Sequence, residues 1–62
     1  MLKNYTRVRL LTDRFCASGV CTGAIGYIIE VYGEDAYEVE FSDPHGITIA
    51  QVVAKRIELE IC

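Results

Sequence analysis

The sequence predicts a single all-β domain spanning residues 1–62, in which five short strands form a small barrel. From Tyr37 to Phe41, apolar and acidic residues alternate strictly, which is the period of a half-buried strand. Segments at residues 33–35 and 43–46 flank this strand, and their glycines are typical of tight turns. A chain of 62 residues has room for only one domain, and closing its sheet would hide strand edges that promote aggregation.

The first strand is expected at residues 5–11. Its side chains alternate in character, with Val8 and Leu10 on one face and Arg7 and Arg9 on the other. A basic strand face can contact nucleic acid, so a nucleic-acid-binding barrel that uses Arg7 and Arg9 is one functional alternative. The balance of 9 acidic against 6 basic residues disfavours this partner. The two arginines could instead pair with acidic residues on a neighbouring strand.

Residues 12–22 are expected to form a loop, which is long for so small a domain. Phe15 and Val20 are predicted to fold back from this loop over an open end of the core. The loop also contains Cys16 and Cys21. An odd total of 3 cysteines is typical of a cytosolic protein, in which thiols stay reduced. We expect Cys16 and Cys21 to pack as small apolar side chains and not to bind a metal.

The second strand is expected at residues 25–32. Its apolar residues recur at every third position, at Ile25, Ile28 and Val31. The glycines and β-branched residues of this segment disfavour a helix. We therefore predict a bulged strand in which these three side chains face inward, while Tyr27 and Ile29 stay partly outside the core.

The remaining elements follow from turns and alternation. A third strand is expected at residues 36–42, with Tyr37, Val39 and Phe41 on one face and Glu38 and Glu40 on the other. A fourth strand at residues 47–53, a 3₁₀ turn at residues 54–56 and a last strand at residues 57–61 complete the chain. In the last strand Ile57, Leu59 and Ile61 alternate with two glutamates, so we expect these three on the core side.

Four segments of the chain resemble a known family. They are residues 8–11 (VRLL), 23–31 (GAIGYIIEV), 36–41 (AYEVEF) and 46–50 (GITIA). Together they are similar to the small bacterial family catalogued as domain of unknown function 4926, whose members are thought to form an SH3-like barrel. The resemblance covers most of the chain, and it implies a five-stranded SH3-like barrel without a defined catalytic residue. Residues 26–31 are also loosely similar to the KOW motif of ribosomal and transcription factors, and this similarity is in line with the nucleic-acid alternative.

Two positions depart from the pattern of this family. Ala24 stands where the family usually has an acidic residue between two glycines, which would change the turn before the second strand. Lys55 and Arg56 stand where the family tends to be acidic, and they would place a basic spot on one rim of the barrel.

No arrangement of residues predicts catalysis, so we expect a non-enzymatic protein with no cofactor and no metal site. The spacing of the loop cysteines does not fit a zinc knuckle, and the other soft ligands, His45 and Cys62, lie elsewhere in the chain. His45 is expected to be an exposed turn residue without a group to orient its imidazole. Glu38 and Glu40 lie about 7 Å apart along a strand. Without a cleft, both carboxylates would remain ionised and solvated.

The composition instead predicts an interaction surface. Hydrophobic residues make up 52% of the chain, and apolar surface that a small core cannot bury often marks a partner-binding or self-association face. Five acids gather on one hairpin: Glu30, Glu34, Asp35, Glu38 and Glu40. We expect a protein partner of basic character to bind a surface composed of Tyr27, Ile29, Glu30, Tyr32, Glu38 and Glu40. The sharpest form of this hypothesis is an antitoxin or immunity-type protein; a structural homo-oligomer is another alternative.

The sequence also bears on location. No apolar run approaches the ~20 residues that span a bilayer. Residues 1–10 lack the apolar segment of a signal peptide. We therefore expect a cytoplasmic protein that does not associate with membranes.

Overall fold

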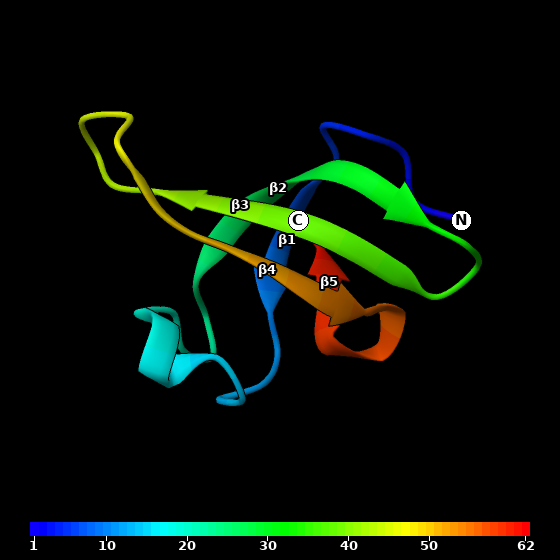
Figure 1. Cartoon of the computed structure of the whole chain (residues 1–62), viewed down its shortest axis with the longest axis horizontal. Helices are drawn as coiled ribbons and strands as arrows, with labels where there is room; N and C mark the ends of the chain where they lie inside the picture. Colours follow the sequence, from blue (N-terminus) through cyan, green and yellow to red (C-terminus); the bar gives the residue numbers. More distant parts are fainter.

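The computed structural model describes residues 1–62 and contains one sheet of five antiparallel strands with two 3₁₀ turns (Figure 1). The strands are β1 (Arg7–Leu10), β2 (Ile25–Tyr32), β3 (Ala36–Ser42), β4 (Thr48–Lys55) and β5 (Leu59–Ile61). The turns are η1 (Cys16–Ser18) and η2 (Arg56–Glu58). The prediction of an all-β domain with five strands and a 3₁₀ turn before the last strand is confirmed. None of the helical segments is long and apolar enough to cross a membrane.

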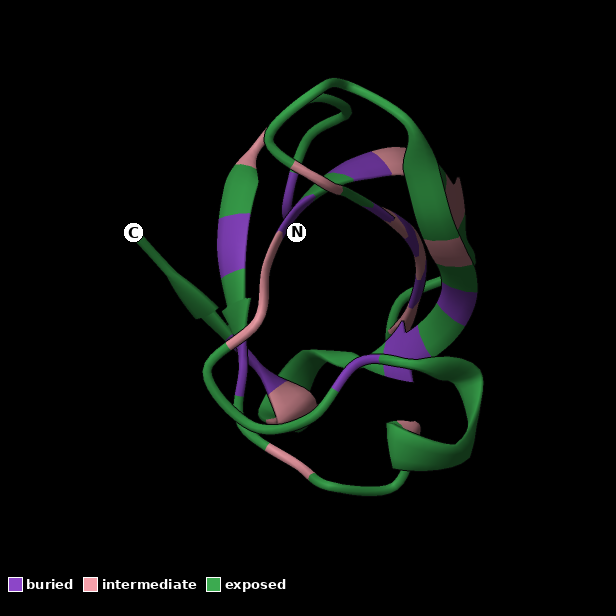
Figure 2. Cartoon of the chain, turned by 90° about the vertical axis from the view of Figure 1, so that its left-hand side faces the viewer, coloured by how far each residue is buried: buried purple, intermediate pink, exposed green.

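The sheet curls until its two edges meet at η2. The strand order is β4-β3-β2-β1-β5, so β4 and β5 are the edge strands. Only the three residues of η2 connect them along the chain, which brings the two edges together at this corner. Figure 2 shows the ribbon curving around a central region, with buried positions on segments at several sides of it. No hydrogen-bonded ladder joins β4 to β5.

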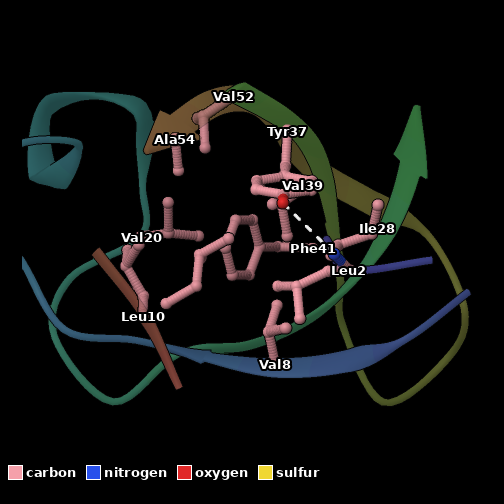
Figure 3. Packing of buried hydrophobic residues seen from close by; sticks show 11 residues of the cluster. Leu2, Val8, Leu10, Val20, Ile28, Tyr37, Val39, Phe41, Val52 and Ala54 are labelled. Carbon is pink, nitrogen blue, oxygen red and sulfur yellow. Dashed lines mark hydrogen bonds between the residues drawn. The ribbon is translucent and has the colours of Figure 1, made fainter. Parts of the chain in front are cut away.

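Eleven apolar residues form one core cluster. They come from all five strands, the N-terminal segment and the long loop: Leu2, Val8, Leu10, Val20, Ile28, Tyr37, Val39, Phe41, Val52, Ala54 and Leu59 (Figure 3). Val20 is buried, and Phe15 packs half-buried against the cluster. The prediction that the loop covers part of the core is therefore confirmed.

A glycine occupies the first inward position of β2. Gly26 lies opposite the buried Val8, so both residues face the core, whereas Ile25 lies opposite Arg9 and shares its outer face. The prediction that Ile25 points inward is wrong. The ring of Phe41 fills the space beside the inner face of β2, so only a glycine fits at the inward position 26. Because neighbouring residues of a strand face opposite sides, Ile25 is turned outward.

The last part of the chain also departs from expectation. β4 is longer than predicted, so the 3₁₀ turn is shifted by two residues, to η2. The Glu58 carboxylate accepts the backbone N–H of Lys55 at 2.8 Å and stabilises this turn. Ile57 lies in the turn and is 81% exposed, and Ile61 on the edge strand is 54% exposed. The prediction that both face the core is wrong, and Leu59 alone of the three is buried.

The long loop after β1 runs beside β4 and η2. The Arg14 guanidinium donates two hydrogen bonds of 2.8 Å to the Glu58 carboxylate and a longer one of 3.4 Å to the backbone carbonyl of Val53. Farther along the loop, Gly19 lies next to Ile49, because a Cβ atom built on this glycine would be 3.4 Å from Ile49 Cγ2. The loop thus lies against β4 at two separate points.

The core contains one buried polar contact that anchors the N-terminal segment. Tyr37 is 1% exposed, and its hydroxyl accepts the backbone N–H of Leu2 at 3.2 Å (Figure 3). We expect Tyr37→Phe to lower the free energy of unfolding by about 1–2 kcal/mol, because it leaves that buried N–H without an acceptor. Urea unfolding would measure the change. Tyr27→Phe, at a tyrosine that is 49% exposed, is the control, and equal effects of both changes would contradict the prediction.

Candidate partner-binding face

The pairing of β2 with β3 places the predicted partner-binding residues on the outer side of the sheet. Directly opposite residues of an antiparallel pair project to the same side. Tyr27 lies opposite Glu40, and Glu30 lies opposite Glu38. Because Glu38 and Glu40 are two positions apart on β3, all four side chains share one side. Tyr27 and Glu30 are exposed there, and the two β3 glutamates are half-buried.

Tyr32 extends this surface at the end of β2. Its hydroxyl donates a hydrogen bond to Glu38 Oε1 at 2.5 Å. This bond, together with some desolvation and the negative charges of Glu38 and Glu30, raises the pKa of Tyr32 above its ordinary value of 10.0. The phenol therefore stays neutral and holds the Glu38 carboxylate over β2.

Ile29 lies at a β-bulge. The register between β2 and β3 shifts between Ile28 and Glu30, so the predicted bulge is confirmed. Ile28 is fully buried, and Val31, opposite the buried Tyr37, packs against the core. Ile29 is left half-buried, which confirms the prediction that it stays partly outside the core.

We define the acidic–aromatic face as Tyr27, Ile29, Glu30, Tyr32, Glu38 and Glu40. It is bordered by two residues of β4 that the sequence did not indicate. Gln51 lies opposite Glu40 and donates a hydrogen bond of 3.3 Å to it, and Val53 lies opposite Glu38 and is 48% exposed. Alternation along β4 could have suggested that both point outward, but only the strand register places them here. No pocket is hollowed into the surface.

The two arginines of β1 have different surroundings. Arg9 forms an exposed ion pair with Glu60 on β5, with a nitrogen–oxygen distance of 2.7 Å. This is the cross-strand pairing that the sequence offered as an alternative to nucleic-acid binding. Arg7 lies opposite Tyr27 and therefore borders the acidic–aromatic face. One of the two positive charges is thus already neutralised within the molecule.

The loop cysteines differ from expectation. Cys16 and Cys21 are exposed and joined by a disulfide. The predictions that they are reduced and that they pack as apolar side chains are wrong, because the loop brings their Cα atoms to 4.6 Å on the solvent side. The Asp13 carboxylate lies beside them, and the three potential ligand atoms are within 4.8 Å of one another. His45 is an exposed turn residue, as predicted, and Cys62 is exposed and free.

Comparison with known proteins identifies a family and nothing closer. The model of the family described as Domain of unknown function (DUF4926) matches residues 5–61, which is nearly the whole chain. No curated protein and no solved structure matches the chain. The family resemblance seen in the sequence is therefore confirmed, and the SH3-like character of the barrel stays a prediction.

Proposed function

The chain belongs to the family described as Domain of unknown function (DUF4926). We propose that it is a non-enzymatic protein-interaction module that binds a basic partner through the acidic–aromatic face. The observation that supports this proposal is the register of β2 and β3, which gathers Tyr27, Glu30, Tyr32, Glu38 and Glu40 on one outer side of the sheet, with the half-buried Ile29 at the bulge between them. Aromatic and aliphatic groups among carboxylates have the composition of a docking surface, with apolar contact area and charge complementarity.

The charge of the molecule suggests what kind of partner would bind. The net charge is -3, and Glu30, Glu38 and Glu40 all lie on the proposed face. Such a surface attracts a basic partner over long distances and disfavours acidic competitors. In its most specific form, the proposal is a cytoplasmic antitoxin or immunity-type protein that covers a basic protein.

We expect Glu38→Lys/Glu40→Lys to weaken partner binding by about tenfold to a hundredfold, because the carboxylates would face the partner's positive charges. The immobilised protein would first capture its partner from an extract of the source cells. Titration calorimetry with the purified partner, at two salt concentrations, would then measure the affinity. Binding to the wild-type chain should weaken with added salt, and the variant should show little salt dependence.

The matched control is Glu34→Lys/Glu60→Lys, which makes the same change in net charge away from the centre of the face. A partner lost by both variants would reveal an effect of overall charge, and undiminished binding to the first variant would rule out the acidic–aromatic face. Light scattering would identify the homo-oligomer alternative if the wild-type chain self-associates and the first variant does not. Retardation of RNA or DNA at low salt, lost in Arg7→Ala, would favour the nucleic-acid alternative instead.

A further inference from the structure

The loop between β1 and β2 gathers three groups that are typical metal ligands. The Asp13 carboxylate and the sulfur atoms of Cys16 and Cys21 lie within 4.8 Å of one another, and all three residues are exposed. Asp13 is held in place, because its Oδ1 atom accepts the backbone N–H of Thr22 at 2.9 Å. Asp13 is exposed, so a cation can reach its carboxylate from solvent.

Contacts other than the disulfide also position this loop. Arg14, next to Asp13 in the chain, is bound to the Glu58 carboxylate by two hydrogen bonds. Phe15 and Val20, the residues adjacent to Cys16 and Cys21, pack against the core cluster. Each cysteine is thus one residue away from a core anchor. Reduction of the disulfide would therefore leave both thiols near each other and near Asp13.

We propose that the reduced loop is a binding site for a thiophilic divalent cation such as Zn²⁺, with Cys16, Cys21 and Asp13 as ligands and water in the fourth position. Zn²⁺ prefers four-coordinate sites built from thiolate, imidazole and carboxylate ligands. The sequence predicted no metal site, because the further ligands considered beside the two loop cysteines were His45 and Cys62. The proposed site uses Asp13 as its third ligand instead. The proposal is independent of the acidic–aromatic face, because that face lies on β2 and β3 and the proposed site lies in the loop before them.

The loop can exist with a Cys16–Cys21 disulfide or with two thiols, and thiol–disulfide exchange converts one state into the other. A dithiol reductant transfers two electrons and two protons to the Cys16–Cys21 disulfide, which yields two thiols, while the reductant becomes a disulfide itself. Binding of the cation then displaces the thiol protons into solvent. A disulfide oxidant that accepts the two electrons, and is itself reduced to a dithiol, re-forms the Cys16–Cys21 bond, removes both thiolate ligands and releases the cation. Cation binding and the disulfide are therefore mutually exclusive.

The test uses the whole chain in a Cys62→Ser background, so that only the loop thiols are present. The protein is reduced with a phosphine, which is removed before titration with Co²⁺ and then with Zn²⁺. We expect the near-ultraviolet absorbance of thiolate-to-cobalt charge transfer to saturate at one ion per reduced chain and to disappear when Zn²⁺ is added. The oxidised chain and the Cys16→Ser/Cys21→Ser variant should show no such absorbance.

Two further variants test the third ligand. Asp13→Asn should weaken Zn²⁺ binding by about tenfold or more, because a neutral amide oxygen replaces a charged carboxylate. Glu34→Gln makes the same chemical change at an exposed turn and should leave the affinity unaltered. Amide resonances in an NMR spectrum would confirm that each variant is folded. The proposal is overturned if the reduced chain gives no charge-transfer band, or if Asp13→Asn binds Zn²⁺ as tightly as the parent chain.

Discussion

Replacing Gly26 with alanine is expected to lower the free energy of unfolding by about 2–3 kcal/mol. A Cβ atom at this position would lie 2.7 Å from the backbone oxygen of Glu40 and 2.8 Å from Cδ1 of Phe41. The oxygen cannot retreat, because Glu40 belongs to β3, which is paired on both sides. A domain of this length has a total stability of only about 3–9 kcal/mol, so the loss is a large fraction of it.

Thermal unfolding followed by circular dichroism would show the effect of Gly26→Ala as a fall in Tm of about 10 °C or more. The control is Gly33→Asn in the turn between β2 and β3. Gly33 has a φ of 67°, where asparagine is tolerated, and no atom lies within 4 Å of the position of an added Cβ. This control should lower stability by only about 1 kcal/mol, the cost of a side chain in the left-handed region, and so by less than Gly26→Ala. A Gly26→Ala chain as stable as the wild type would contradict the packing described for β2.

Glu58→Gln is expected to lower the free energy of unfolding by about 1–2 kcal/mol at neutral pH. The Glu58 side chain is only 12% exposed and binds both the Arg14 guanidinium and the N–H of Lys55. The amide can keep the bond to Lys55, but it loses the charged pair with Arg14. Because the Arg14 side chain is 51% exposed, solvent screening reduces the size of the effect.

The same pair should make stability depend on pH. The hydrogen bonds from Arg14, assisted by the N–H of Lys55 and by nearby positive charge, lower the pKa of Glu58 from 4.5 to about 2. A carboxylate with a lowered pKa stabilises the fold fully above its unfolded pKa. Its contribution is then lost as the pH falls from about 4.5 through 2. Urea unfolding at a series of pH values should show that the difference between wild type and Glu58→Gln shrinks over this range.

Glu60→Gln is the matched control for both measurements. It breaks the ion pair with Arg9, in which both side chains are about half exposed, so it should cost less than about 0.5 kcal/mol. If Glu58→Gln and Glu60→Gln behave alike, the link between the loop and η2 does not stabilise the fold.

The central hairpin was the most predictable part of the chain. Tyr37, Val39 and Phe41 alternate with Glu38 and Glu40, and the structure buries the first three and turns the glutamates outward. This pattern alone determines which face of β3 meets the core. The sequence also predicted a surface in which Tyr27 and Glu30 accompany the two glutamates, and the register of β2 and β3 puts these four residues on one side. The candidate face could be assembled from sequence because it depends on local alternation and one short turn.

Features that depend on distant partners were not predictable. Ile25 matched an inward period, but the ring of Phe41 occupies the inner side of β2 at its neighbour, Gly26. Ile57 matched the alternation of a strand, but the side chain of Glu58 helps to close a 3₁₀ turn around it. In both cases a contact across the fold overrides a local pattern.

The chemistry of the long loop was hidden for a related reason. Cysteine number suggested reduced, buried thiols, whereas the disulfide of Cys16 and Cys21 follows from the path of the loop between two core anchors. Likewise, no sequence motif joins Asp13 to these cysteines. Their proximity arises from the turn that the loop makes between β1 and β2.

The attachment of the long loop to β4 also limits how this molecule can pair with other chains. β4 is an edge strand of eight residues, and a free edge of that length is a template for strand addition and fibre growth. Here the Arg14 guanidinium donates a hydrogen bond to the backbone carbonyl of Val53, and the Glu58 carboxylate accepts one from the backbone N–H of Lys55. The opposite edge, β5, has only three residues. The C-terminal end of the β4 edge therefore offers two fewer backbone groups to a strand of another molecule, which disfavours its use in a continuous intermolecular sheet.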